Sequence, residues 1–400
     1  IPKMKVLLVN HFPLEGSGSG IYTKNIASKL TELGHEVMVI LPEHTNISKP
    51  YITKSILFRS EANKGEKVDA EFNFPCFTTH PKSNNTFYQL TDEQMHHYID
   101  LMQIAIDEAV ATFKPDIIHC QHLWIAPYCA SKTGVPYVAT AHGTDLKGLV
   151  LDSRYVPYAL EGAKKSKKII TISKQVDYEV GEKYSVPDSL RRLILNGFDE
   201  SIFNLKPVSR KEVLASFGLP DAGNVVSFVG KLAHFKGVDL LLKAAKIYEE
   251  EVEDVMTLIV GHGELYDELN NLRRSLGLKH VYLLGHQHQE KVADIYNIAD
   301  VSTVPSRKEP FGLVAIEALA CGTPVVVTNG GGLVDFVDDT IGSVIDEEDY
   351  EALAKSIISE IKNPDKKAKR KRAHEFAMKE FSWNRVIDEV IDVYEKAIKG

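Results

Sequence analysis

The sequence has few cysteines, no excess of basic residues and no apolar segment of membrane-spanning length. Its four cysteines form no Cys-x-x-Cys pair, which favours buried free thiols in a reducing compartment. No window approaches the ~18 apolar residues that a spanning helix requires. A net charge of −8 over 400 residues argues against nucleic-acid binding, because nucleic-acid binders use excess cations to displace counterions. We therefore expect a soluble, cytoplasmic protein without a nucleic-acid partner.

Two common ligand-binding patterns are also absent. Gly16, Gly18 and Gly20 form a glycine-rich segment, but no third glycine completes the G-x-G-x-x-G spacing, so a nicotinamide site is disfavoured. The histidines His119 and His122 lack a third metal ligand at a convincing spacing. No Asp-x-Asp pair occurs in the candidate site motifs. We therefore expect neither a metal nor any other cofactor.

Strand-like and helix-like segments alternate along the chain, which is typical of parallel sheets covered by helices. The Asn196-Gly197 turn interrupts this alternation. We predict an α/β fold with two Rossmann-like domains, 1–196 and 197–380, and an amphipathic C-terminal helix within 381–400. The main predicted strands are 6–9, 37–40, 117–119, 137–141, 168–172, 225–229, 257–260, 281–284, 301–303 and 325–328; the helices are 21–33, 92–113, 238–250, 264–276, 291–299 and 313–321.

The segment SRKEPFGLVAIEALACGTPVVVTNGGG contains the strongest candidate site. Glu309 and Glu317 lie eight positions apart, and a helix is predicted to start between them. Amides at a helix start are orphan donors at a positive dipole end and suit phosphate oxygens. A carboxylate accepts two hydrogen bonds and suits the vicinal diol of a ribose or hexose. The amides here belong to Phe311, Gly312 and Leu313. Two glutamates at this spacing also occur as ordinary solvated charges.

A second group of candidates follows the predicted strand 225–229. Gly230 and Lys231 come directly after this strand, and Lys236 follows five residues later. Ligands bind α/β sheets outside the carboxyl ends of the strands. The two lysines there suit a diphosphate whose negative charge grows as a bond to it breaks. Without this context, two lysines before a helix would be read as solvated charges.

The quoted segment resembles the Glu-x7-Glu signature of retaining glycosyltransferases of family 4, which have the two-domain GT-B fold. The resemblance implies two Rossmann-like domains facing each other across a cleft, with the last helix packed back on the first domain. It also implies that Glu309 contacts hydroxyls of the donor sugar and that Glu317 holds the nucleotide ribose.

The same resemblance extends to other segments. It implies that His142, in AHGTD, contacts the donor sugar, that the loop with His286 reads the nucleotide base, and that the glycine loop with Gly18 and Gly20 approaches the donor phosphates and the acceptor. The family has an arginine where this chain has Lys231, and a lysine cannot reproduce the planar fork of a guanidinium.

These observations favour a retaining transferase that moves a hexosyl group from a nucleoside diphosphate sugar, with a UDP-sugar favoured, to an unidentified acceptor hydroxyl in an α-linkage. A sugar-nucleotide epimerase on the same scaffold and a non-catalytic sugar-nucleotide-binding protein remain alternatives. The basic run within 366–372 is either a solvated helix face or a patch for anionic lipid. The latter would place the protein at the inner face of the membrane. The sequence does not indicate an oligomeric state.

Overall fold

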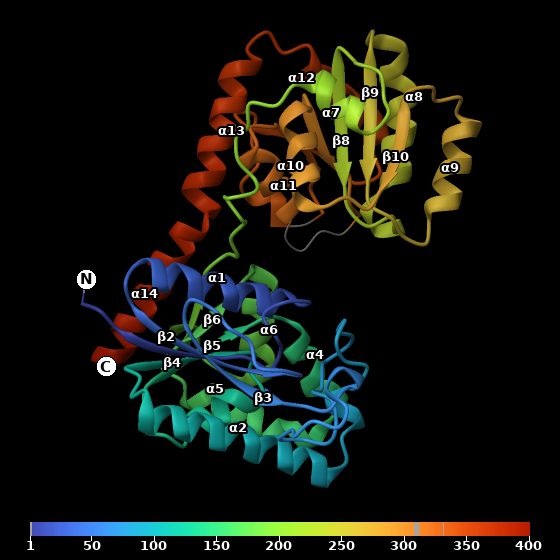
Figure 1. Ribbon diagram of the computed structural model, residues 1–400. Coiled ribbons are helices and arrows are strands. Elements are labelled where there is room, and N and C mark those ends of the chain that lie inside the picture. Colours follow the sequence, from blue (N-terminus) through green and yellow to red (C-terminus); the bar gives the residue numbers. More distant parts are fainter. Residues whose placement is uncertain (1, 308–311, 331) are drawn as a thin grey trace. The chain divides into compact units, whose positions relative to one another are not determined.

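The computed structural model describes residues 2–307, 312–330 and 332–400, which divide into two units (Figure 1). Unit 1 comprises Ile1–Asn196 together with Trp383–Gly400, and unit 2 comprises Gly197–Ser382. The division thus lies at the Asn196-Gly197 turn.

Unit 1 is built on a parallel sheet whose order, among the described residues, is β3-β2-β1-β4-β5-β6-β7. The chain order reverses between β1 and β4, and such a switch point opens a crevice at the carboxyl ends of the strands. The strands are β1 (Lys5–Val9), β2 (Glu36–Glu43), β3 (Ile52–Leu57), β4 (Ile117–Gln121), β5 (Tyr137–Ala141), β6 (Ile169–Thr171) and β7 (Arg191–Leu193).

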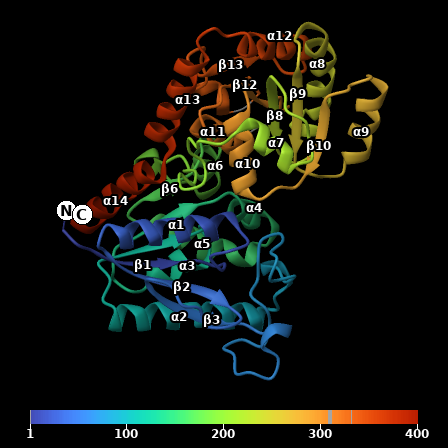
Figure 2. The same cartoon turned by 45° about the horizontal axis from the view of Figure 1, so that its top comes forward.

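Helices cover both faces of this sheet (Figures 1 and 2). Because side chains alternate along a strand, Leu7 and Val9 pack into the core formed with α2, whereas Val6 and Leu8 pack into the core formed with α1 and α14. The helices of unit 1 are α1 (Gly18–Glu32), α2 (Asp92–Thr112), α3 (Ile125–Ala130), α4 (Thr144–Leu151), α5 (Val156–Lys165), α6 (Lys174–Tyr184) and α14 (Trp383–Lys399).

The C-terminal helix α14 is held on unit 1 by polar as well as apolar contacts. The hydroxyl of Tyr394 lies 2.6 Å from Nδ1 of buried His119, and Arg192 donates to Asp392 at 2.5 Å. Lys29 of α1 donates to Asn384 at 3.0 Å. A segment far away in the sequence therefore completes the helical layer on one face of the unit 1 sheet.

Unit 2 has the same kind of architecture. Its sheet is parallel, with the order β10-β9-β8-β11-β12-β13 among the described residues, and the chain order reverses between β8 and β11. The strands are β8 (Asn224–Val229), β9 (Val255–Val260), β10 (Val281–Gly285), β11 (Val301–Val304), β12 (Val325–Thr328) and β13 (Gly342–Ile345). The helices are α7 (Arg210–Ser216), α8 (Val238–Glu251), α9 (Tyr266–Ser275), α10 (Gln289–Ile298), α11 (Leu313–Ala320), α12 (Tyr350–Ile361) and α13 (Lys366–Phe381).

The basic run 366–372 lies on α13, and several of its charges are engaged within unit 2. Lys366 pairs with Asp300 at 2.9 Å, Lys369 pairs with Glu360 at 2.5 Å, and Arg370 donates to the carbonyl of Ala299 at 2.7 Å. The prediction of a wholly solvated face is therefore wrong for these residues. In the described part of the chain, no helix combines the length and the apolar character needed to cross a membrane.

Candidate functional site

Unit 1 contains a cavity of about 300 Å³ at the carboxyl ends of its central strands. Phe12 follows β1, His122 follows β4 and His142 follows β5, and all three line the cavity. Ser17 and Gly18, at the start of α1, form another part of the wall. The cavity therefore lies at the switch point of the sheet, where α/β folds bind ligands.

His142 is a neutral side chain with a fixed orientation. Its Nε2 lies 2.8 Å from Oε1 of Gln121, and its ring packs edge-on against Tyr22 at 5.0 Å between centroids. Burial and the nearby His122 ring hold the pKa of His142 well below its usual value. Because Nε2 donates to Gln121, the neutral ring presents Nδ1 as an acceptor. His142 can thus orient a hydroxyl, but it is a weak base at neutral pH.

Asp145 organises the loops behind this cavity. Its side chain is fully buried and accepts hydrogen bonds from the amides of Leu123 (2.7 Å) and Gly143 (2.8 Å). Burial alone would raise the pKa of this carboxyl, but the adjacent His122 and the Leu123 amide lower it to about 2. The loops after β4 and β5 are therefore tied together by one buried carboxylate.

His122 has two unusual features. Its backbone has a φ of +72°, a region that non-glycine residues adopt infrequently. Its side chain is about 2% exposed, and neither ring nitrogen has a hydrogen-bond partner, although Nδ1 lies 3.8 Å from Asp145. Buried polar atoms normally have partners, so these nitrogens call for a functional explanation.

One prediction about unit 1, the glycine loop before a helix at 21, needs correction, and the neighbouring histidines His119 and His122 have different environments. His119 does not line the cavity: its ring nitrogens lie 2.6 Å from the Tyr394 hydroxyl and 2.7 Å from the Thr140 hydroxyl, and burial lowers its pKa to about 3. The glycine segment is not a loop before a helix at 21, because α1 already begins at Gly18.

Within that first turn, the two glycines differ. A side chain at Gly18 would meet open space, whereas a Cβ at Gly20 would approach the carbonyl oxygen of Pro13 to 2.2 Å. The amide of Gly20 donates to the capping hydroxyl of Ser17 at 3.0 Å. Gly18 therefore stays at the cavity wall, whereas close packing against Pro13 requires a glycine at position 20; the predicted ligand role of Gly20 stays a prediction.

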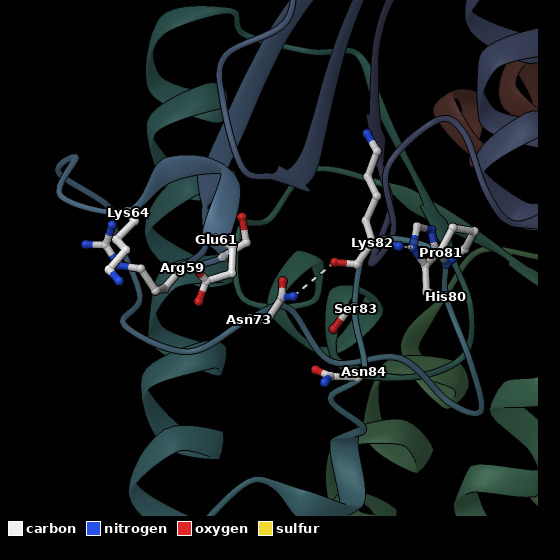
Figure 3. Close-up of a pocket in the computed structure, with 10 residues that line it drawn as sticks. Arg59, Glu61, Lys64, Asn73, His80, Pro81, Lys82, Ser83 and Asn84 are labelled. Atoms are coloured by element: carbon white, nitrogen blue, oxygen red, sulfur yellow. Dashed lines mark hydrogen bonds between the residues drawn. The ribbon is translucent and has the colours of Figure 1, made fainter.

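A second, larger cavity of about 760 Å³ adjoins the first one through His80, which lines both (Figure 3). Arg59 and Lys64 lie at its other side, and Lys82 extends from its wall. Arg59 pairs with Glu71 at 3.0 Å, and Lys82 lies 3.5 Å from Glu43. Two of the cations near this cavity are thus already compensated.

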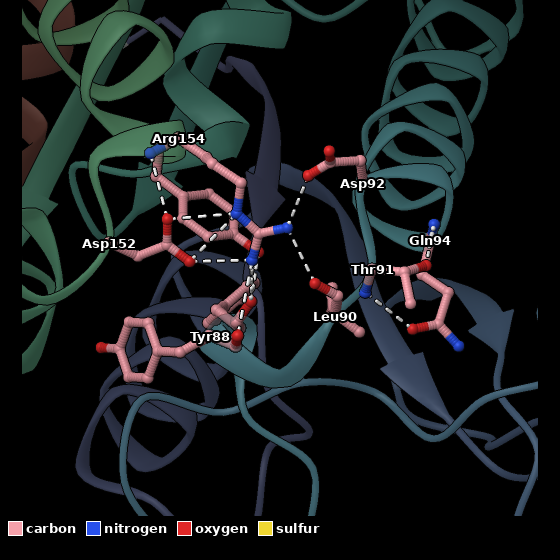
Figure 4. A network of polar contacts seen from close by, with 9 residues as sticks. Tyr88, Leu90, Thr91, Asp92, Gln94, Asp152 and Arg154 are labelled. Carbon is pink, nitrogen blue, oxygen red and sulfur yellow. Dashed lines mark hydrogen bonds and ion pairs between the residues drawn. The ribbon is translucent and has the colours of Figure 1, made fainter.

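A polar network around Arg154 fixes the wall of the first cavity from behind (Figure 4). The guanidinium pairs with Asp152 at 2.8 Å and with Asp92 at 2.9 Å, and it donates to the carbonyl of Leu90 at 2.8 Å. These contacts of Arg154 hold the 3₁₀ turn η2 (Phe87–Gln89) in place. The ring of Phe87 in this turn packs against Phe77 of the cavity wall, with 4.9 Å between the ring centroids.

Unit 2 has a cavity of about 300 Å³ at the carboxyl ends of β8, β9 and β10. Gly230, Lys231 and His286, all predicted from the sequence, line it together with His262. Gly261, with a φ of +130°, lies so close to the Gly230 carbonyl that a Cβ would approach its oxygen to 1.8 Å. Only glycine therefore fits at this strand end.

Lys236 lies on the 3₁₀ turn η5 (His234–Lys236), beside the Gly230 backbone. Arg307 holds this turn in place: it forms a bidentate pair with Asp239 at 2.9 and 3.0 Å and donates to the carbonyl of His234 at 2.7 Å. The sequence reading missed Arg307, because its partner Asp239 is 68 residues away. In the sequence, only the position of Arg307 within the SRKEPFG motif could have indicated a role at the site.

Helix α11 begins at Leu313, with Gly312 as its N-cap, and carries Glu317 near its middle. Burial and the nearby Asp199 carboxylate raise the pKa of Glu317 to about 8. Glu309 and Phe311 lie outside the described residues. Their predicted roles in sugar and phosphate binding thus stay predictions from the sequence. Among the residues that are described, no cluster of three potential metal ligands occurs.

Comparison with known proteins matches both halves of the chain to glycosyltransferase models. Residues 16–202 match the model for glycosyltransferase family 4, and residues 209–379 match that for glycosyl transferases group 1. A glycosyltransferase of Methanocaldococcus jannaschii is 29% identical, with 85% of this chain and 84% of that protein covered. The D-inositol 3-phosphate glycosyltransferase of Nocardiopsis dassonvillei is 32% identical, with 70% of each covered.

The solved structures agree on the fold. The Anabaena protein Alr3699/HepE, solved in complex with UDP and glucose, superposes with a TM-score of 0.66 at 19% identity, and the match covers 98% of this chain and 99% of that chain. The family models and the curated relatives favour a glycosyltransferase over the two alternatives, the epimerase and the non-catalytic binding protein. The chain belongs to the family 4 type of glycosyltransferases and is a glycosyltransferase enzyme with the GT-B fold.

Proposed function

We propose that the enzyme transfers a hexosyl group from a nucleoside diphosphate sugar, with a UDP-sugar favoured, to an acceptor hydroxyl with retention of the α configuration. The observation that carries this proposal is the group of Gly230, Lys231 and His286 around one cavity at the strand ends of unit 2, with Lys236 beside it. The similar Anabaena protein, solved with UDP and glucose, supports this choice of donor.

The donor contacts divide according to chemistry. Lys231 and Lys236 stabilise the departing diphosphate, together with the amides at the start of α11. Glu317 accepts hydrogen bonds from the ribose hydroxyls, and Glu309 orients the sugar. Arg307 keeps the Lys236 turn in position through Asp239 and the carbonyl of His234.

The transfer step proceeds on one face of the sugar. The bond between the anomeric carbon and the diphosphate oxygen breaks, the acceptor oxygen bonds to the same face, and its proton passes to the leaving phosphate oxygen. An inverting mechanism would need a strong general base. His142 is poorly suited to that task because its pKa is lowered by burial and by His122. It positions the sugar instead.

The anomeric configuration of the product tests the mechanism. The purified enzyme is incubated with α-linked UDP-hexoses and an acceptor panel, and proton NMR reads the anomeric coupling of the first product. An α-product supports retention. A β-product from an α-donor would overturn the mechanism and would move His142 to the role of catalytic base.

Two variants test the donor contacts. Lys236→Ala should lower kcat, because its charge meets negative charge that grows in the transition state, whereas the exposed lysine in Lys243→Ala serves as the matched control. Since lysines and amides take the charge, EDTA should change the rate little. A strict requirement for magnesium or manganese would contradict this assignment.

The names of some related enzymes identify an acceptor. The similarity to D-inositol 3-phosphate glycosyltransferases would suggest a phosphorylated polyol. Whether this chain has a site for such a phosphate depends on the chemistry of the cavity in unit 1.

A further inference from the structure

The cavity at the switch point of unit 1 has a distinctive lining. One part is apolar and includes Phe12 and Phe77, and the rest is made of hydroxyls, imidazoles and one amide. Among the residues described as lining it, none is a lysine, an arginine, an aspartate or a glutamate. Its volume of about 300 Å³ lies at the small end of the range for ligand pockets, so it suits a single ring.

The histidines of the cavity do not supply a net positive charge. Burial and His122 keep the pKa of His142 well below its usual value, and burial also lowers that of His80. The buried Asp145 carboxylate lies 3.8 Å from Nδ1 of His122, so this pair adds no net positive charge to the cavity. A phosphate dianion buried here would lack a counter-charge, and burying an unpaired charge is very costly.

Two nearby positive features do not change this conclusion. The start of α1 offers only about half a charge from its dipole, which does not balance a phosphate dianion. In the adjoining cavity, Arg59 and Lys82 are compensated by Glu71 and Glu43, and Lys64 lies on the side away from His80 (Figure 3).

The unpartnered nitrogens of His122 indicate what the cavity does bind. The residue is about 1% exposed, its ring lines the cavity, and its backbone has a φ of +72°. A residue held in an infrequent conformation with unsatisfied buried nitrogens is typical of a ligand site. A hydroxyl group of a ligand can donate to or accept from an imidazole nitrogen.

We propose that the acceptor ring bound in unit 1 is an uncharged sugar or polyol, not a phosphorylated one, and that His122 hydrogen-bonds one of its hydroxyls. The apolar wall with Phe12 and Phe77 then faces the C–H side of the ring. Because the bound ring is called an acceptor, this inference rests on the proposed transfer function. Binding of the ring can nevertheless be measured without the donor.

Saturation-transfer difference NMR and titration without donor compare matched probes: methyl α-glucoside with glucose 6-phosphate, and myo-inositol with inositol 3-phosphate. The neutral member of each pair should bind at least about tenfold more tightly than its phosphorylated counterpart. Equal or tighter binding of the phosphorylated probes overturns the proposal, and so does the absence of binding by both classes.

Three variants sharpen the test. His122→Phe should weaken binding of the neutral probes by about three- to tenfold, as expected for one lost hydrogen bond. His122→Asn is the matched control, because asparagine tolerates positive φ and keeps a polar side chain; it should retain most of the affinity. Thr79→Arg, at the exposed edge of the cavity, should shift the preference toward the phosphorylated probes by at least about fivefold.

The outcomes separate this inference from the proposed function. If UDP is released with phosphorylated acceptors only, the transfer function stands and the neutral acceptor is wrong. If neutral rings bind through His122 but no UDP-sugar is consumed with any of them, the binding inference stands and the UDP-sugar donor is wrong. A loss of binding in His122→Phe counts only when its thermal unfolding midpoint matches that of His122→Asn. If His122→Phe binds the neutral probes as the wild type does, the role of His122 is refuted.

Discussion

Binding of UDP should release a proton from Glu317. In the free enzyme, burial and the neighbouring Asp199 raise the pKa of this carboxyl to about 8, so it is mostly protonated at pH 7. Ribose hydroxyls that donate to the carboxylate favour its ionised form and lower the pKa. The bound state then holds fewer protons than the free state, and the difference leaves with binding.

The size of the effect follows from the raised pKa. With a pKa of about 8, roughly nine tenths of the enzyme carries the proton at pH 7, and removing it costs about 1.4 kcal/mol. We therefore expect release of about 0.9 proton per UDP at pH 7 and roughly tenfold tighter binding at pH 9. Isothermal titration calorimetry in buffers with different ionisation enthalpies measures the number of protons directly.

The matched control is Glu317→Gln, which keeps the shape of the side chain but cannot titrate. This variant should release no proton and should bind UDP with the same affinity at pH 7 and pH 9. If the wild type releases less than about 0.2 proton, or if the glutamine variant releases as much as the wild type, the ribose contact of Glu317 is refuted. Unchanged binding of UDP, GDP and ADP by Glu317→Ala would have the same meaning.

Three further predictions concern the framework of the site. Gly237→Ala should destabilise unit 2 by more than about 2 kcal/mol in urea unfolding, because φ is +71° and a Cβ would lie 1.9 Å from the Pro305 carbonyl oxygen. The control is Gly277→Ala, where φ is +67° but the space is open; it should cost only about 1 kcal/mol. Arg307→Ala should lower kcat more than Arg307→Lys, since the bidentate pair that holds the Lys236 turn is lost; equal kcat values would contradict the positioning role. The free energy of unfolding should fall below pH 6.5, because His119 and His142 stay neutral in the folded protein and gain protons on unfolding. Each histidine contributes about 1.4 kcal/mol per pH unit. An unfolding midpoint that is unchanged between pH 7 and pH 5 would argue against the neutral folded histidines.

The sequence predicted the sheets well where buried strands consist of apolar, β-branched residues. The predicted strands 137–141 and 325–328 coincide with β5 and β12, and the others differ by a few residues at their ends. Strand β3 was missed because its sequence, ITKSIL, mixes polar and apolar residues at the edge of the sheet. The start of α1 was placed three residues late, because a glycine-rich segment favours a loop until the hydroxyl of Ser17 caps it.

The candidate site was harder to predict where its geometry depends on distant contacts. His119 and His122 occur in one short motif, and the sequence treated them alike. Tyr394, which lies 275 residues from His119, occupies one of its ring nitrogens, whereas neither ring nitrogen of His122, in the cavity wall, has a hydrogen-bond partner. Local patterns locate the strand end, but the partners that decide which side chain remains available come from other parts of the chain.

The two switch points differ in electrostatics, and this difference has a consequence for specificity. The unit 2 cavity is lined by Lys231 and has Lys236 beside it on the turn η5, whereas the described lining of the unit 1 cavity holds no charged side chain. Attraction between exposed opposite charges is screened by salt, but hydrogen bonds and apolar contacts of a neutral ring are much less sensitive. The affinity for UDP should therefore fall as salt increases, while the affinity for a neutral acceptor should change little. Because the charged and the neutral contacts lie in different cavities, uncharged residues around His122 can change in the proposed acceptor pocket without weakening diphosphate binding.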